Sequence, residues 1–171
     1  MNIFEPLPKS LCPTEFKSLK DLLDYVAITH QHLPAFTCAG LTLSYREIDE
    51  LSTRFAAYLQ TETSLVPGDR IAIQLPNLLQ FPIALFGAIK AGLVVVSTNP
   101  LYTAHEMKHQ FRDSGAKGIV ILESFCQKLE EILPNTQIET VIVATLGDIR
   151  SAVARFGINF IAKYVKGVVP A

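Results

Sequence analysis

Apolar and polar residues in the first third of the chain follow two helical repeats separated by a short extended stretch. Ser18 is placed to cap the first predicted helix. The apolar face of this helix carries Leu19, Leu22, Leu23 and Val26. Ser44 forms a capping-box pattern with Glu47, which predicts a second helix to about residue 62. Between the two helices, apolar residues flank Ala39-Gly40 and predict a small β-hairpin.

From residue 70 onward, short apolar strands alternate with helices. Strands are predicted at 71–75, 94–96, 119–122 and 141–144, and helices at 79–91, 103–114 and 124–133. The strands are apolar on both faces, which is typical of a parallel sheet covered by helices. The predicted fold class is therefore α/β: a doubly wound, mostly parallel sheet with flanking helices and a small N-terminal β-hairpin.

This pattern divides the chain into three segments: an N-terminal extension at 1–17, the α/β unit at 18–147, and a basic amphipathic helical segment at 148–171. Asp148 can cap the last segment, and the charged residues after it are all basic. They are Arg150, Arg155, Lys163 and Lys166. Two interpretations of 149–169 stay open: it lies on an anionic membrane surface, or it packs on the rest of a larger protein.

Composition favours a piece of a larger protein. Apolar residues make up 49% of the chain and charged residues only 18%, against about 25% charged residues in a typical soluble domain. A membrane span is excluded on length, because the best apolar run, 81–97, contains Pro82 and Lys90 and falls short of about 20 residues. A net charge of −1 argues against a nucleic-acid partner. The three scattered cysteines suggest neither disulfides nor a zinc site, so a cytoplasmic location is expected.

The sequence His105-Glu106-Met107-Lys108-His109 spells the H-E-x-x-H motif of zinc metalloproteases. On a helix the two histidines stand one turn apart, and the glutamate is placed to activate a zinc-bound water. Three features oppose this interpretation. Thr103 forms a capping box with Glu106, the histidines fall opposite the apolar face of the helix, and the charge of Lys108 works against a metal. A solvated helix face is the preferred interpretation, with a zinc metallohydrolase kept as an alternative.

One loop stands out as a candidate ligand contact. The residues Thr98–Tyr102 follow the strand that ends near Ser97, and ligands of open parallel sheets gather beyond the carboxyl ends of the strands. Asn99 and Tyr102 either contact a ligand there or shape the turn. No glycine-rich phosphate loop precedes a helix in this chain, so no cofactor-binding residue is assigned.

An ordered series of short motifs resembles the opening region of the adenylate-forming, AMP-binding enzymes, and most of all the bacterial long-chain fatty-acid–CoA ligases. The series is Leu-Ser-Tyr-Arg-Glu-Ile (43–48), Gly-Asp-Arg-Ile-Ala (68–72), Leu-Pro-Asn (75–77), Ala-Leu-Phe-Gly-Ala-Ile-Lys-Ala-Gly (84–92), Asn-Pro-Leu-Tyr-Thr (99–103) and Asp-Ser-Gly-Ala-Lys (113–117). The similarity covers most of the chain from about Ser18, which would then be part of a larger adenylate-forming N-terminal domain.

The resemblance implies a ligase that uses ATP, Mg²⁺ and CoA to convert a fatty acid to its acyl-CoA through an acyl-adenylate. The phosphate loop and catalytic residues of that family come after the region present here. No catalytic, cofactor-binding or metal residue is therefore assigned, and the chain alone is expected to be inactive and to bind none of these cofactors. Its expected partners are the remainder of its own polypeptide and the fatty acid. A homodimer and the inner membrane face are further candidates. A non-catalytic membrane-binding module centred on 149–169 is the remaining alternative.

Overall fold

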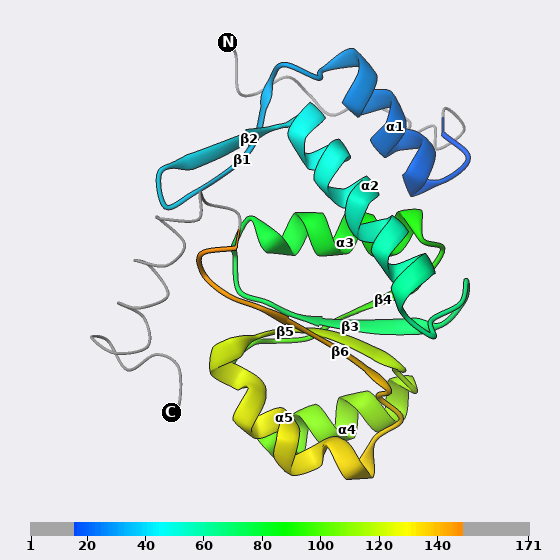
Figure 1. The fold of residues 1–171 in the computed structure, drawn as a ribbon, viewed down its shortest axis with the longest axis vertical. Helices are drawn as coiled ribbons and strands as arrows, with labels where there is room; N and C mark the ends of the chain where they lie inside the picture. The colour runs from blue at the N-terminus through cyan, green and yellow to red at the C-terminus, as the bar shows by residue number, and fades with distance from the viewer. Residues whose placement is uncertain (1–15, 149–171) are drawn as a thin grey trace, which may run out of the picture.

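The computed structural model of the protein describes residues 16–148 (Figure 1). Residues 1–15 of the extension predicted at 1–17 lie outside this range, as do residues 149–171 of the basic segment predicted at 148–171. The first part of the fold contains two helices and a two-stranded antiparallel sheet. These elements are α1 (Leu19–Thr29), β1 (Pro34–Cys38), β2 (Leu41–Ser44) and α2 (Tyr45–Glu62).

Local sequence signals set the ends of these elements as predicted. The Ser18 hydroxyl accepts the backbone N–H of Asp21 at 3.1 Å, and Ser44 and Glu47 form the complete capping box of α2. The hairpin turns at Ala39 and Gly40, which both have positive φ. Two consecutive residues in that conformation give a turn whose twist matches the flanking strands.

A four-stranded parallel sheet forms the centre of the fold, in the order β4-β3-β5-β6. Its strands are β3 (Arg70–Gln74), β4 (Val94–Ser97), β5 (Gly118–Leu122) and β6 (Thr140–Ala144). The connecting helices are α3 (Gln80–Lys90), α4 (Ala104–Ser114) and α5 (Cys126–Ile132), with 3₁₀ turns at Glu123–Phe125 and Leu133–Asn135 around α5.

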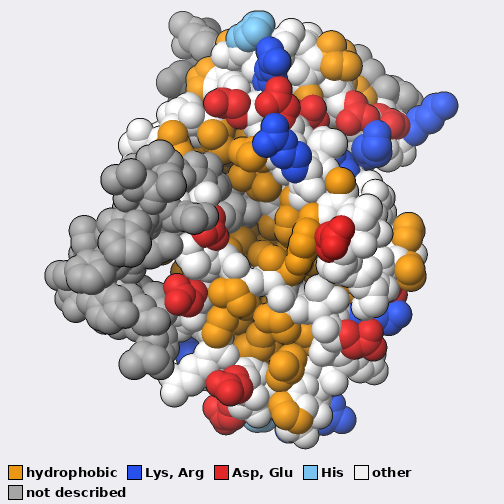
Figure 2. Space-filling model, in the orientation of Figure 1, with side chains coloured by type: hydrophobic (Ala, Val, Ile, Leu, Met, Phe, Trp, Pro, Cys, Tyr) orange, Lys and Arg blue, Asp and Glu red, His pale blue; other side chains and the backbone are white. Residues whose placement is uncertain are grey.

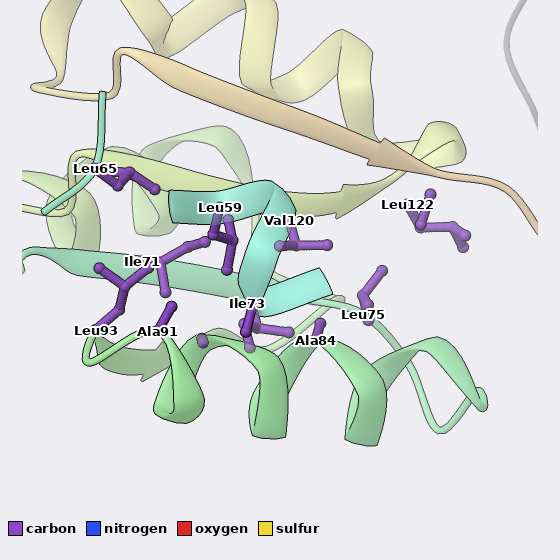
Figure 3. Packing of buried hydrophobic residues seen from close by; sticks show 13 residues of the cluster. Leu59, Leu65, Ile71, Ile73, Leu75, Ala84, Ala91, Leu93, Val120 and Leu122 are labelled. Atoms are coloured by element: carbon purple, nitrogen blue, oxygen red, sulfur yellow. The ribbon is translucent and has the colours of Figure 1, made fainter. Parts of the chain in front are cut away.

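Helices cover both faces of this sheet, which confirms the doubly wound α/β prediction. In Figure 1, α3 lies against one face with α2 beyond it, and α4 and α5 lie against the other. Each face has its own apolar cluster. The first joins α2 and α3 to strand residues such as Ile71, Ile73 and Val120, and Figure 3 shows it from close by. The second contains Met107 and Phe111 of α4 beneath Ile119 and Ile121 of β5.

The prediction that the strands are covered on both faces holds only for the two central ones. Every residue of β5 is buried, as are four of the five in β3. The edge strands keep valines in contact with solvent: Val94 of β4 is 48% exposed, and Val141 and Val143 of β6 are 39% and 48% exposed. Edge strands have a neighbour on one side only, so their apolar side chains receive less cover.

Helix α1 forms where it was predicted, but no residue of it is buried. Its apolar face borders an open groove of about 320 Å³ between α1, α2, α3 and β1. An amphipathic repeat therefore identified the helix correctly without telling whether its apolar face is covered. Among the described residues, no helix combines the length and the apolar character that crossing a bilayer requires.

Candidate functional site

The carboxyl ends of the parallel strands form the candidate site, because the topology reverses there. The chain passes from β3 to β4 through α3 on one face, and then crosses back over β3 to β5 through α4 on the other. Loops after neighbouring strands β3 and β5 consequently diverge to opposite faces. This is where open α/β sheets bind ligands. The loop 98–103 lies at the same edge, one strand further out.

Asn99 is built into the turn of this loop. Its side-chain Oδ1 accepts the backbone N–H of Leu101 at 3.0 Å, and its carbonyl accepts the N–H of Tyr102 at 3.2 Å. Asn99 is exposed at this edge, and Leu101 beside it is 81% exposed. The residue thus shapes the turn and also stands at the surface where a ligand would pass.

Tyr102 is more firmly held. Its side chain is half-buried against the apolar cluster beneath α4 and α5. Its backbone carbonyl accepts Nζ of Lys128 at 3.1 Å, which ties the loop to α5. The structure therefore brings Asn99 and Tyr102 together on one loop and gives each a role in the turn.

Two glutamines that the sequence analysis did not single out hold the same loop. Gln74, at the end of β3, is fully buried, and its Nε2 donates to the carbonyl of Asn99 at 3.4 Å. Gln110 of α4 donates from Nε2 to the carbonyl of Ser97 at 3.1 Å. In both side chains Oε1 is buried without a hydrogen-bond partner. A lone glutamine at the end of an otherwise apolar strand is the sequence signal that could have identified Gln74.

The H-E-x-x-H motif lies on the solvent face of α4, as predicted. His105 and His109 are exposed. The Glu106 carboxylate accepts both the backbone N–H and the hydroxyl of Thr103 at 2.8 Å, closing the capping box of the helix. These two hydrogen bonds, the backbone one foremost, lower the pKa of Glu106. The glutamate is thus committed to the helix N-terminus rather than to activating a water.

A hollow of about 510 Å³ lies over the motif, lined by His105, Lys108, His109, Arg112 and Asp113. Two permanent cations at this spacing oppose a bound metal ion. Across residues 16–148, no three histidine, cysteine or acidic side chains are grouped so as to hold a metal. The geometry does not support the zinc-hydrolase alternative.

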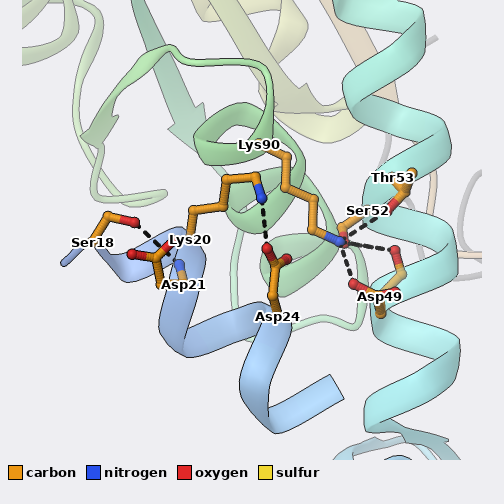
Figure 4. Close-up of polar contacts among 8 residues, drawn as sticks. All are labelled: Ser18, Lys20, Asp21, Asp24, Asp49, Ser52, Thr53 and Lys90. Atoms are coloured by element: carbon orange, nitrogen blue, oxygen red, sulfur yellow. Dashed lines mark hydrogen bonds and ion pairs between the residues drawn. The ribbon is translucent and has the colours of Figure 1, made fainter. Parts of the chain in front are cut away.

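A second polar cluster, also missed from sequence, joins α3 to α2 (Figure 4). Lys90 is only 9% exposed, and its Nζ contacts the Asp49 carboxylate at 2.6 Å. The same ammonium donates to the Asp49 carbonyl at 3.0 Å and to the hydroxyls of Ser52 and Thr53 at 2.9 Å. All its protons have acceptors, so Lys90 acts as an interhelical connection and not as a reactive amine.

The residues present do not fit the phosphates of ATP. The loops after β3, β4 and β5 (75–79, 98–103 and 123–125) contain no glycine, and a phosphate cradle needs closely approachable backbone N–H groups. The N-terminus of α4 is already occupied by the carboxylate of Glu106, whose charge would repel a phosphate. No step of ATP chemistry is assigned to these residues.

Comparison with known proteins agrees with this architecture. A family model described as "AMP-binding enzyme" matches residues 23–157. The long-chain-fatty-acid–CoA ligase of Salmonella typhimurium is 42% identical over 96% of this chain, and that of Haemophilus influenzae is 44% identical over 95%. The chain spans about 29% of the length of each.

Solved structures show the same likeness. The N-terminal domain of FACL13 from Mycobacterium tuberculosis superposes with a TM-score of 0.69 at 26% identity, over 75% of this chain and 34% of that one. The fold, the order of elements and the family model all agree over most of the chain. The chain belongs to the family of AMP-binding enzymes.

Proposed function

We propose that this chain is the N-terminal part of a long-chain fatty-acid–CoA ligase. The observation that carries the proposal is the 42–44% identity to such ligases over nearly the whole chain. The reaction of the longer polypeptide has two steps. The carboxylate of a fatty acid displaces pyrophosphate from ATP to give an acyl-adenylate. The thiol of CoA then attacks the acyl carbon, releasing AMP and forming the acyl-CoA thioester.

ATP, Mg²⁺ and CoA serve the longer polypeptide in this proposal, and the residues that bind them lie outside this chain. The chain contributes a scaffold: the first strands of a sheet and the helices that cover them. Its principal partner is the remainder of its own polypeptide, and the fatty acid is the substrate of the assembled enzyme. The open groove beside α1 and the exposed edge valines are consistent with surfaces that a larger protein covers.

Within this scaffold, Asn99 and Tyr102 form the edge of the substrate site. The position of their loop beyond the carboxyl end of β4 supports this assignment. The strong exposure of Leu101 between them supports it as well, because an apolar side chain at that edge can meet an acyl chain.

The three predicted segments fit the same proposal: an extension at 1–17, the α/β unit at 18–147 and a basic segment at 148–171. We place the enzyme in the cytoplasm and propose that 149–169 packs on the remainder of the polypeptide. Docking of 149–169 on the inner membrane face is the competing proposal. A homodimer is compatible with either.

Fatty-acid-dependent exchange of pyrophosphate into ATP tests the proposal directly. The longer polypeptide should catalyse exchange with long-chain acids, and the 171-residue chain alone should not. Exchange by the chain alone would place catalytic residues within it and contradict the proposal. The longer polypeptide could instead catalyse exchange with another carboxylic acid and with no long-chain acid. That result would support the adenylation chemistry and contradict the long-chain fatty-acid substrate.

A further inference from the structure

The groove beside α1 has the character of a binding site for an extended apolar peptide. It has a volume of about 320 Å³ and its lining includes the aromatic residues Phe36, Tyr45 and Phe86. The rings of Phe36 and Phe86 are tilted at 55° with their centroids 6.2 Å apart. Figure 2, in the orientation of Figure 1, shows charged side chains gathered over the part of the molecule where α1 and α2 lie. The apolar lining of the groove contrasts with that charged surface.

The groove offers no free charge to a ligand. Among the described residues that line it, only Asp49 and Lys90 are charged, and they pair with each other at 2.6 Å. The ammonium of Lys90 also donates to the hydroxyls of Ser52 and Thr53 (Figure 4). A fatty-acid carboxylate would therefore find no unpaired cation here, and burying it without one is unfavourable. The occupant of the groove must bind through apolar contacts.

The chain enters α1 from alongside the helix. Phe16 lies three residues before the start of α1, and its ring packs against that of Tyr25 with the centroids 5.3 Å apart. Tyr25 is six residues into the helix, which is roughly 9 Å along the axis at about 1.5 Å per residue. It also neighbours the groove residue Leu22, because helical positions three apart lie on one side. Phe16 thus lies at the flank of the groove, and a segment ahead of it reaches the groove within a few residues.

The sequence before Phe16 has the composition that such a groove binds. It contains Phe4-Glu5-Pro6-Leu7-Pro8, in which the prolines disfavour a helix and favour the extended polyproline II conformation. That conformation has about three residues per turn, so Phe4 and Leu7 fall on one face. Proline-rich segments in this conformation bind aromatic-lined grooves in other proteins. From Leu7 to Phe16 the chain can span about 28 Å, which exceeds the length of roughly 16.5 Å of the 11-residue α1.

We propose that the segment Phe4–Pro8 of this chain occupies the α1 groove, with the side chains of Phe4 and Leu7 in contact with its aromatic residues. The short connection to α1 favours this occupant over a free peptide or a second copy, because a tethered segment has an effective concentration of about millimolar. The segment covers the apolar face of α1, none of whose residues is buried by the described part of the chain. The inference does not depend on the proposed ligase function.

A spin label on the segment tests the proposal in the 171-residue chain. The label is attached at Asn2→Cys after the native cysteines have been replaced by Cys12→Ser, Cys38→Ser and Cys126→Ser. It should strongly broaden the methyl signals of Leu22 and Val26, because the docked segment holds the label beside the groove. The signals of Leu129 in α5, which lies at the opposite end of the molecule from α1 (Figure 1), are the control and should stay sharp. Sharp signals from Leu22 and Val26 would overturn the proposal and leave the groove to another part of a longer polypeptide.

Matched variants of the labelled chain test which face of the segment docks. Leu7→Asp alters the face that enters the groove and should abolish the broadening. Leu11→Asp makes the same chemical change on a different face of the three-residue repeat and should leave the broadening in place. Equal effects of the two variants would contradict the proposed face. Labelled chain mixed with unlabelled, isotope-enriched chain reveals a second copy: broadening in that mixture would show binding between molecules and overturn the proposal.

Urea denaturation gives a second measurement that needs no label. Leu22→Ala should lower the midpoint in the wild type and have little effect once Leu7→Asp has released the segment, because residues in contact are energetically coupled. Ile28→Ala alters a residue of α1 that is 74% exposed and lies outside the groove, so its small effect should be the same in both backgrounds. Additive effects of Leu22→Ala and Leu7→Asp would contradict a contact between the segment and the groove.

Discussion

At the scale of single residues, Lys90 shows how one charge can connect two helices. It interrupts the apolar repeat of α3, and its ammonium is surrounded by acceptors from α2. Removing it leaves the Asp49 carboxylate and the Ser52 hydroxyl without their donor. Removing one member of a buried ion pair leaves the other charge buried without a partner. This lowers the free energy of unfolding by more than the intact pair contributes to it.

Replacing Lys90 with methionine should therefore lower the free energy of unfolding by about 2 kcal/mol. This is less than for a fully buried pair, because the Asp49 side chain is still 38% exposed. Urea denaturation measures the change. The matched control is Lys20→Met, which breaks the solvent-exposed Lys20–Asp24 pair on α1 and should cause no measurable loss. Equal effects of the two substitutions would contradict the connecting role of Lys90.

Glu106 gives a prediction with a defined pH dependence. Its pKa is lowered in the folded state by hydrogen bonds from Thr103. The stability it contributes is therefore present above its unfolded pKa of about 4.3 and is lost as the pH falls through the lower folded value. The difference in thermal midpoint between the wild type and Glu106→Ala should be clear at pH 7 and shrink below pH 4.

Gln127→Ala, on the exposed side of α5, is a suitable control because it removes no ionisable group. Its effect should not change with pH. A difference for Glu106→Ala that persists unchanged at pH 3 would show that the carboxylate does not act through its charge.

Metal analysis of the purified chain tests the H-E-x-x-H motif separately. A stoichiometric zinc ion that is present in the wild type and lost in His109→Ala would restore the metal interpretation of the motif.

At the scale of elements, the closest packing occurs where α2 crosses α3. A Cβ added at Gly87 would lie 2.7 Å from the Phe55 ring and 2.9 Å from the carbonyl oxygen of Ser52. The backbone oxygen cannot move without displacing α2. Glycine is needed here for close approach, although it lowers the helix propensity of α3.

Gly87→Ala should reduce the free energy of unfolding by about 1–2 kcal/mol, because overpacking outweighs the gain of about 1 kcal/mol in helix propensity. Chemical denaturation provides the measurement. Ala57→Gly, on the exposed face of α2, calibrates the propensity effect alone and should cost about 1 kcal/mol. Stabilisation by Gly87→Ala would mean that the helices separate more easily than the structure implies.

At the scale of the whole molecule, the basic segment 149–169 has two competing partners, the remainder of the polypeptide and an anionic membrane surface. If 149–169 packs on the remainder of the polypeptide, the binding of the longer polypeptide to anionic vesicles should not depend on the charge of this segment. Co-sedimentation with vesicles rich in phosphatidylglycerol should be unchanged when Lys163 and Lys166 are both replaced with glutamate. Uncharged phosphatidylcholine vesicles are the control. Lost binding in the double variant would favour the membrane, because each basic residue near such a surface contributes about 1 kcal/mol.

Much of the fold could be predicted because its signals are local. Ser44 with Glu47, Thr103 with Glu106, and Gly115 at the end of α4 mark helix ends through hydrogen bonds within a few residues. The candidate site was only partly predictable. The loop of Asn99 and Tyr102 followed from the strand before it, but Gln74 and Gln110 act on this loop from other elements, and such pairings have no signature in sequence spacing.

The sequence by itself determined the helices, the strands, the parallel α/β class and the family resemblance, since each depends on residue order and on periodicity along the chain. Only the tertiary structure decided which apolar faces are covered. It left α1 and the edges of β4 and β6 open while burying all of β5 and four of the five residues of β3. It also joined Lys90 of α3 to Asp49 of α2. Burial depends on neighbours from distant parts of the chain, and periodicity identifies an apolar face without identifying what packs on it.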